Sequence, residues 1–438
     1  MSIDLKYQVP TVAIHTQVFK AVTQSVVRVN GAPRMRQVYV PHPVMGKTAE
    51  QMRADIEGND PVTGRPVMRE VIEGLTEVLT PEDLKGLTFE RSTPRLCDPA
   101  TEEELQKLFL ESDWTDKLPI VLPTEERVAK MLKHTSRKPE EIVGHLSPTH
   151  FREAWEYTVE KVAVNAVMAG ARPEYFPVIL ALAASCVSAR GSSTSSMASM
   201  AVVNGPIRHE LGMNAGIGAL GPYNHANATI GRAYGLLSQN LQGGSVPGHT
   251  YMGSMGNAYA YASPTFPENE ERSPWEPLHV QYGFRPEDNV LTVFGSCRST
   301  AFMFGFRREY WREHFRNLLR GLDPNGAATL LLDPIVARLI IDIAGLKTKA
   351  AVIDWVYENA CMPAGEYWDY QLIQNYKLPR ATFGEEPYAS KLKAAPEEMV
   401  PMFTRDEINV VVVGGETNGY WRIMGADRRQ AVCIDEWR

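Results

Sequence analysis

The sequence predicts an α/β protein with an incomplete Rossmann-like parallel strand–helix–strand unit at the N-terminus, followed by a large mixed α/β domain. Three observations lead to this fold class. A β-branched run at 9–16, helical spacing at 19–29 and a second strand at 37–40 form the first unit. The run 408–413 (INVVVV) is the strongest strand signal in the chain. Helical patterns occupy much of the sequence between them.

The N-terminal unit shows only two strands before its pattern stops. Two parallel strands do not make a stable sheet, because their edges and faces stay open. We therefore expect the missing strands to come from elsewhere, either from the run at 408–413 or from a separate chain. The alternative is a small appendage packed on the main core.

The chain divides into three expected regions. Residues 1–80 form the partial α/β unit, 81–150 form a proline-rich helical linker region, and 151–438 form the large α/β catalytic domain. Within them we expect a strand leading in from 286–293 and several helices. The expected helices lie at 102–111, 124–132, 159–167, 173–187, 310–319, 333–343 and 348–359.

Composition excludes several classes of function. A net charge of −7 gives no basic excess with which to neutralise phosphates, so no nucleic-acid partner is expected. No apolar run reaches the ~18 residues of a membrane span, and the N-terminus lacks a signal-peptide pattern. The five cysteines are widely spaced without a CxxC pair, which indicates reduced thiols in a cytoplasmic protein. Phosphate-loop, dinucleotide-binding and HExxH motifs are absent, so no cofactor and no metal is predicted.

The segment 266–279 (FPENEERSPWEPLH) is the main candidate for a reaction site. An extended conformation would put Glu268 and Glu270 on one side, while Trp275 beside Glu276 would raise the pKa of that carboxyl by desolvation. Buried carboxylates need partners, and Arg272 is the nearest. The alternative is an acidic surface loop anchored by its tryptophan. As catalytic acid–base candidates we take Glu268, Glu270, Glu271 and His279.

A glycine- and asparagine-rich stretch at 204–256 offers groups to orient a substrate. Asn204, Asn214 and Asn227 are short polar side chains among glycines, and Arg232 suits a carboxylate or phosphate. Together with Trp275, these residues are the predicted substrate-binding set. The alternative is that the asparagines hold turns through their own backbone.

Two further sites are possible on residue type alone. Cys297 follows a predicted strand at a glycine turn, where Arg298 would lower the thiol pKa, so it joins the catalytic candidates. A metal site built from Glu276, His279 and either His225 or His249 is a third possibility for the acidic segment.

Several long motifs resemble a known family. The N-terminal PTVAIHTQVF, GAPRMRQVYVPHPVMGKT and DPVTGRPVM resemble the C-terminal half of the UGSC-like family, named for a Sec/Cys-Gly-Ser-Cys motif. TVEKVAVNAVMAGARPEYFPVILA, VVNGPI, LGMNAGIGALGPYNHANATIGRA and ENEERSPWEPLH resemble the large domain that accompanies it. The chain starts after the point where that thiol motif would stand. The resemblance therefore implies a small companion subunit carrying a Cys-Gly-Ser-Cys motif, and thiol-linked chemistry on a small molecule.

The leading functional hypothesis is a cytoplasmic enzyme acting on a small anionic organic substrate by carboxylate and histidine acid–base chemistry, as a hydrolase, hydratase or lyase. It would be the large subunit of a two-subunit enzyme if the companion exists. One alternative is a thiol-dependent oxidoreductase with a partner-supplied cysteine. Another is a non-catalytic scaffold or binding subunit.

Overall fold

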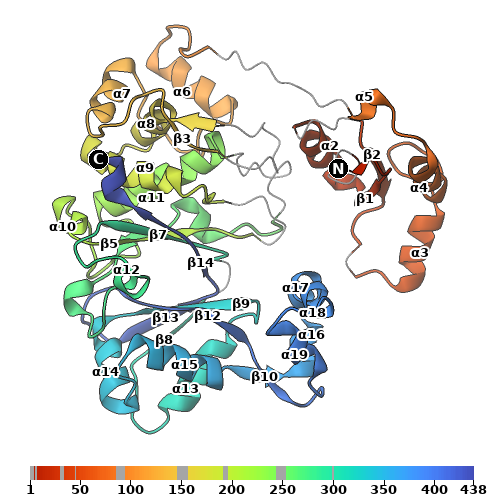
Figure 1. The fold of residues 1–438 in the computed structure, drawn as a ribbon. Coiled ribbons are helices and arrows are strands. Elements are labelled where there is room, and N and C mark those ends of the chain that lie inside the picture. Colours follow the sequence, from red (N-terminus) through yellow and green to blue (C-terminus); the bar gives the residue numbers. More distant parts are fainter. Residues whose placement is uncertain are drawn as a thin grey trace.

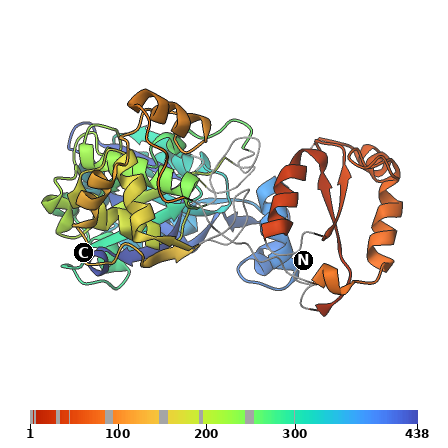
Figure 2. The ribbon, with the colours of Figure 1, turned by 90° about the horizontal axis from the view of Figure 1, so that it is seen from above.

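The computed structural model describes residue 4 and residues 7–29, 34–44, 46–84, 94–145, 156–190, 196–242, 253–297 and 300–438. These residues form a large body and a smaller N-terminal unit, which Figures 1 and 2 both show to one side of the body.

The N-terminal unit is the predicted strand–helix–strand arrangement. β1 and β2 pair in parallel, with Val12 opposite Arg36 and Thr16 opposite Val40. Val38, Val40 and Val67 form a small buried cluster on this pair. The elements are β1 (Val12–Thr16), η1 (Gln17–Phe19), α2 (Lys20–Val29), β2 (Arg36–Val40), α3 (Ala49–Glu57), α4 (Val67–Thr76) and α5 (Pro81–Leu84).

The predicted source of its missing strands within this chain is wrong. The run at 408–413 belongs to β12 (Phe403–Val412), which pairs in parallel with β9 (Gly326–Leu332) inside the body. Among the described residues, β1 and β2 form a two-stranded sheet.

The body contains two four-stranded mixed sheets. The first has the order β14-β7-β5-β6 and the second β12-β9-β13-β8. Their remaining strands are β5 (Met200–Asn204), β6 (Thr265–Pro267), β7 (Val290–Gly295), β8 (Thr300–Phe304), β13 (Tyr420–Met424) and β14 (Asp427–Cys433).

The two sheets and the helices form four layers in the order helix–sheet–sheet–helix (Figure 1). An apolar cluster lies between each pair of neighbouring layers. Alternate residues of a strand point to opposite faces, so each sheet can bury both faces. In β5, Ala201 and Val203 join the first helical core, while Met200 and Val202 join the cluster between the sheets. Val410 and Val412 of β12 join the second helical core.

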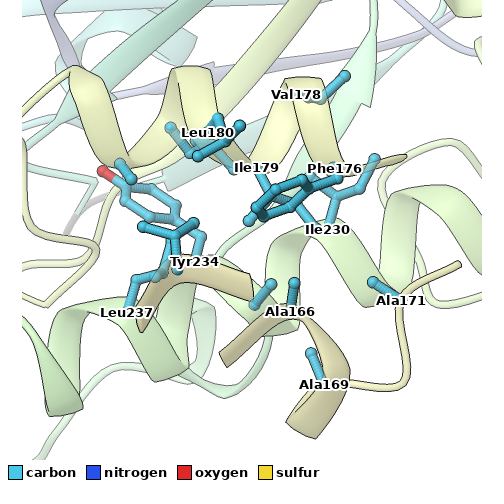
Figure 3. Close-up of a cluster of buried hydrophobic side chains, with 14 of the residues drawn as sticks. Ala166, Ala169, Ala171, Phe176, Val178, Ile179, Leu180, Ile230, Tyr234 and Leu237 are labelled. Carbon is cyan, nitrogen blue, oxygen red and sulfur yellow. The ribbon is translucent and has the colours of Figure 1, made fainter. Parts of the chain in front are cut away.

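The first helical core is the largest of the described clusters. Figure 3 shows part of it. It packs α8 (Val159–Met168), α9 (Phe176–Ala184) and α11 (His225–Asn240) on the first sheet. α9 is apolar on every side and buried from Phe176 to Ala183, as the sequence predicts. The second core is covered by α13 (Trp311–Arg320), α14 (Pro334–Ala344) and α15 (Lys349–Asn359).

Part of the expected linker region is built into the body. Phe109 of α6 (Glu102–Glu111) and Val128 and Met131 of α7 (Glu125–Leu132) lie in the first helical core. The helices form where the sequence predicts them. Their buried apolar faces, however, fix this part of the chain to the body.

Short elements complete the described chain: β3 (Ile142–His145), β4 (Glu156–Thr158), η2 (Pro173–Tyr175), α10 (Ile207–Glu210), η3 (Ala258–Tyr261), η4 (Glu270–Arg272), α12 (Leu278–Gln281), β10 (Cys361–Pro363), α16 (Ala364–Asp369), α17 (Gln371–Tyr376), α18 (Leu378–Thr382), α19 (Tyr388–Lys393), β11 (Met399–Pro401) and η5 (Ile434–Trp437). Among the described helices, none has the length and apolar character needed to cross a membrane.

Candidate functional site

The segment 266–279 passes from the first sheet to the second helical core and back. Phe266 and Leu278 lie in the cluster between the sheets, whereas Trp275 lies in the second helical core. The Trp275 indole donates a hydrogen bond to the Lys347 carbonyl, 3.1 Å away. The prolines and short 3₁₀ turn suit such a crossing, because neither sheet nor helix could be continuous there. We call this segment the strap.

Trp275 therefore anchors the strap in the core. The predicted desolvation of Glu276 by this ring is wrong, because Glu276 is exposed. The predicted partner Arg272 also points elsewhere, since it pairs with Glu416 at 3.0 Å.

Asn204 brings two of the predicted glutamates together. β5 and β6 are parallel neighbours, so Asn204 at the end of β5 and Glu268 just after β6 meet at the same edge of the sheet. Its Nδ2 donates to Glu268 Oε2 at 2.7 Å and to Glu270 Oε1 at 2.9 Å. Both amide protons are used in this way, which fixes the orientation of the side chain.

Glu268 is completely buried and forms an ion pair with Lys349, which is also completely buried. Lys349 Nζ lies 3.1 Å from Glu268 Oε1, and the Leu278 amide donates to Oε2 at 2.6 Å. Lys349 is the first residue of α15, below the second sheet, so this ion pair connects the two halves of the sandwich. A buried carboxylate requires such partners, since burial of either charge alone costs several kcal/mol.

Glu270 and Glu271 share the guanidinium of Arg208. Arg208 Nη2 lies 3.0 Å from Glu270 Oε2 and 2.9 Å from Glu271 Oε1. The Gly205 amide also donates to Glu270 Oε1 at 2.9 Å. His209 Nε2 lies 2.8 Å from Glu271 Oε1. We call these residues the carboxylate cluster: Asn204, Arg208, Glu268, Glu270, Glu271 and Lys349.

The partners of Glu271 set its protonation. Hydrogen bonding to Arg208 is the largest cause that lowers the pKa of Glu271 to about 2, with His209 adding to it against partial burial. Glu271 is therefore a carboxylate at neutral pH. The cluster holds three glutamates and two basic residues, Arg208 and Lys349.

His279 directly follows Leu278, whose amide donates to Glu268. The ring is 1% exposed, and neither ring nitrogen has a hydrogen-bond partner among the described residues. The same is true of Asn204 Oδ1. Buried polar atoms without partners are rare and mark strain, water or a functional role.

The structure places three predicted substrate-binding residues elsewhere. Arg232 pairs with Asp116 at 2.8 Å, on the side of the body covered by the 102–132 region. Asn227 Oδ1 accepts from the Asn214 amide, and its Nδ2 donates to the carbonyls of Asn214 and Ala219. These two asparagines hold the loop before α11, which is the turn-forming role that was the alternative.

Cys297 is completely buried in the cluster between the sheets. Its Sγ lies 3.8 Å from the carbonyls of Phe294 and Gly295. The predicted activating residue, Arg298, lies outside the described residues. This apolar setting is typical of an inert core thiol.

The described part of the chain does not support the metal hypothesis. Within it, no three or more His, Cys, Asp or Glu side chains are grouped to hold a metal ion. His225 packs against the Tyr175 ring at 5.8 Å, and His249 lies outside the described residues.

Two residues of the cluster, Arg208 and Lys349, were not predicted from the sequence. Arg208 stands four residues after Asn204 in NGPIRHE, so a short turn after β5 brings it back to the strap. That spacing was a usable signal. Lys349 gave none, because it follows the N-cap Thr348 of an ordinary helix and reaches Glu268 only through the packing of the two sheets.

A cavity of about 590 Å³ lies at another place on the body, between residues 136–141 and the C-terminal residues 435–438. Charges of both signs line it, and Arg137, Asp435 and Arg438 are engaged in bonds within the protein. None of the predicted site residues lines this cavity.

Comparison with known proteins identifies one region. Residues 3–61 contain a UGSC family domain, which confirms the predicted resemblance for this part of the chain. No curated protein and no solved structure matches the chain. The resemblance predicted for the large domain therefore stays a prediction.

Proposed function

We propose that the protein is an enzyme that acts on a small organic substrate through carboxylate acid–base chemistry, of the hydrolase, hydratase or lyase type. The observation that carries this proposal is the sharing of Asn204 Nδ2 by Glu268 and Glu270. An acid–base carboxylate is effective when buried polar partners fix its position before the substrate binds. Here Glu268 is buried against Lys349, whereas Glu270 is partly exposed.

Glu270 is the proton-transfer group in this proposal. Its side chain is 13% exposed, whereas that of Glu268 is inaccessible. Glu268 is a positioning residue, since it holds Asn204 and is held by Lys349. Glu271 anchors Arg208, because a carboxyl group with a pKa of about 2 carries no proton to donate at neutral pH. His279 would assist from its buried position.

The surroundings of the cluster do not favour the anionic substrate that was expected from the sequence. Arg232, expected to attract an anion, is neutralised by Asp116. The cluster itself has three glutamates and only two basic residues, Arg208 and Lys349. This balance favours a neutral substrate or one that carries a hydrogen-bond donor.

A second candidate is the thiol-dependent oxidoreductase with a cysteine supplied by a companion subunit. The UGSC domain at 3–61 and the two-stranded sheet in it favour this candidate. Ile14 in the middle of β1 is 48% exposed, so this face of the two-stranded sheet is not covered by the described residues. Trapping a mixed disulfide between a small Cys-Gly-Ser-Cys protein and a substrate thiol would favour it over the carboxylate mechanism.

The third candidate, a non-catalytic scaffold, would make the cluster a structural connection between the sheets. Consumption of metabolites from a cell extract, followed by mass spectrometry, separates it from the enzyme. We expect the purified protein to deplete a small molecule, and Glu270→Gln to slow that depletion by about 100-fold or more, in the range of a lost acid–base group. Glu276→Gln, an exposed glutamate of the same strap, is the matched control and keeps full activity. Unchanged turnover in Glu270→Gln, or no depletion by the wild type, contradicts the proposal.

A further inference from the structure

The proposed chemistry needs a second proton-transfer group besides Glu270. A hydrolase, hydratase or lyase step removes a proton at one atom and delivers a proton at another. The other two glutamates of the carboxylate cluster do not suit this role. Glu268 is completely buried, and Glu271, with a pKa of about 2, is a weak base that holds no proton at neutral pH. His279 is 1% exposed, so a substrate does not reach its ring from the solvent.

His209 has the accessibility that these groups lack. It is the third residue of α10, and its side chain is 66% exposed. Its Nε2 lies 2.8 Å from Glu271 Oε1, the same oxygen that Arg208 Nη2 contacts at 2.9 Å. That arginine nitrogen also lies 3.0 Å from Glu270 Oε2. Glu271 and Arg208 therefore connect the His209 ring to the Glu270 carboxyl group.

Glu271 determines which nitrogen of the His209 ring is available to a substrate. Hydrogen bonding to Arg208 is the largest cause that lowers the pKa of Glu271 to about 2, so its carboxylate only accepts hydrogen bonds at neutral pH. The contact at 2.8 Å then requires a hydrogen on His209 Nε2. Among the described residues, none forms a hydrogen bond with His209 Nδ1. A carboxylate that holds one ring nitrogen leaves the other for proton transfer.

We propose that His209 is the second catalytic residue and transfers a proton to or from the substrate through Nδ1. This inference rests on the proposed function and names the partner of Glu270 in it. In an elimination, a Glu270 carboxylate takes a proton from carbon, and the C–H electron pair forms the double bond. The C–O bond breaks, and the leaving oxygen receives the proton of His209 Nδ1. Exchange with water restores both groups, and addition of water to the double bond follows the same steps in reverse.

Kinetics of the full chain, with the substrate found by metabolite profiling, test this role. His209→Gln should lower kcat by about 100-fold or more, as expected for a lost acid–base group. It should also remove the change in kcat between about pH 5 and 8 that titration of a histidine causes. The exposed His134, in another part of the body, provides the matched control, and His134→Gln should keep kcat within about twofold of the wild type.

A second measurement tests contact with the substrate without turnover. Diethyl pyrocarbonate acylates accessible histidines, and mass spectrometry of the digested protein reports each site. In the slow variant Glu270→Gln, saturating substrate should reduce the acylation rate of His209 at least threefold and leave that of His134 unchanged. A histidine with a merely structural role outside the site would not be protected.

The outcomes separate this inference from the proposed function. Full turnover in His209→Gln, when Glu270→Gln is slow, overturns the role of His209 alone. So does a slow His209→Gln whose pH profile matches that of the wild type, or acylation of His209 that the substrate does not change. Absence of any depletion by the wild type overturns the proposed function and this inference together.

Discussion

The body buries lysines in two different ways, and the difference bears on which cluster we propose as the reaction site. In the carboxylate cluster, Lys349 faces the buried Glu268. In a second cluster, Lys377 and Lys391 face aromatic rings. Lys391 Nζ lies 4.6 Å from the Tyr367 ring centre and donates to the Pro401 carbonyl at 2.6 Å, and Lys377 Nζ lies 4.9 Å from the Tyr388 ring centre. We call Lys377, Lys391, Tyr367 and Tyr388 the tyrosine–lysine cluster.

The first arrangement gives its lysine a direct carboxylate partner. In the second, the described residues place no carboxylate within ion-pair distance of Lys391, and its amine bonds to a backbone carbonyl instead. Burial, aided by the nearby Lys377, lowers the pKa of Lys391 to about 8. A carbonyl and an aromatic face favour a cation less than a carboxylate does. The tyrosine–lysine cluster has one glutamate nearby, Glu407, whose pKa is raised by burial, whereas the carboxylate cluster gathers three glutamates around one amide and one guanidinium. We therefore assign chemistry to the carboxylate cluster.

The largest expected effect is on the Glu268–Lys349 pair. Lys349→Ala should lower the free energy of unfolding by about 3–5 kcal/mol, because Glu268 is left buried without its counter-ion. Urea denaturation measures this change. The exposed Lys347→Ala is the matched control, with an expected change within about 0.5 kcal/mol.

Removing both charges sharpens this test. Lys349→Met combined with Glu268→Gln should be more stable than Lys349→Ala alone, since no unpaired charge remains. A cost below about 1 kcal/mol for Lys349→Ala would mean that the pair is not buried as described.

A smaller effect is expected at Lys391. At pH 7, Lys391→Met should change the free energy of unfolding by about 1 kcal/mol or less, because the lost hydrogen bond is offset by relief of the buried charge. The pH dependence is more specific. The folded pKa of about 8 lies below the ordinary 10.5, so the unfolded chain binds more protons between these values. Stability should therefore rise with pH over that window.

Urea denaturation between pH 7 and 10.5 measures this slope. Lys391→Met should flatten the slope, and the exposed Lys393→Met should leave it unchanged. A slope that persists in Lys391→Met would show that another group causes it.

The smallest effect is expected at Glu271, whose side chain is 53% exposed. Its folded pKa of about 2 lies below the ordinary 4.5, so its contribution is full above pH 4.5 and is lost as the pH falls towards 2. Solvent screening limits this contribution to about 1 kcal/mol or less. Glu271→Gln should reduce the acid dependence of unfolding between pH 4.5 and 2, and Glu276→Gln should not. If both variants show the same acid unfolding, the interaction of Glu271 with Arg208 does not stabilise the folded protein.

Local patterns in the sequence were sufficient for the elements. The strand–helix–strand unit, the apolar helix at 173–187 and the helix at 348–359 all form within a few residues of their predicted ranges. Their causes are local: hydrophobic period, β-branching and capping residues such as Thr348. The partner of the run at 408–413 was not predictable in this way. An apolar strand fits several neighbours, and pairing depends on the whole fold.

The site shows the same limit. Asn204 met Glu268 and Glu270 as expected, because polar residues at the ends of adjacent parallel strands share one edge. Arg232 did not join these residues, because it pairs with Asp116 instead. Asp116 is far away in the sequence, and its position next to Arg232 depends on how the 102–132 region packs. Lys349 comes from the opposite helical layer, so only the stacking of two sheets could reveal it.

The most direct test of the central claim compares the two clusters in one assay. Depletion of the substrate found by metabolite profiling is measured for Glu270→Gln and Lys391→Met side by side. The account predicts that Glu270→Gln loses about 100-fold or more of the turnover, as expected for a lost acid–base group, while Lys391→Met stays within about twofold of the wild type. Loss of turnover in Lys391→Met with full activity in Glu270→Gln would contradict it.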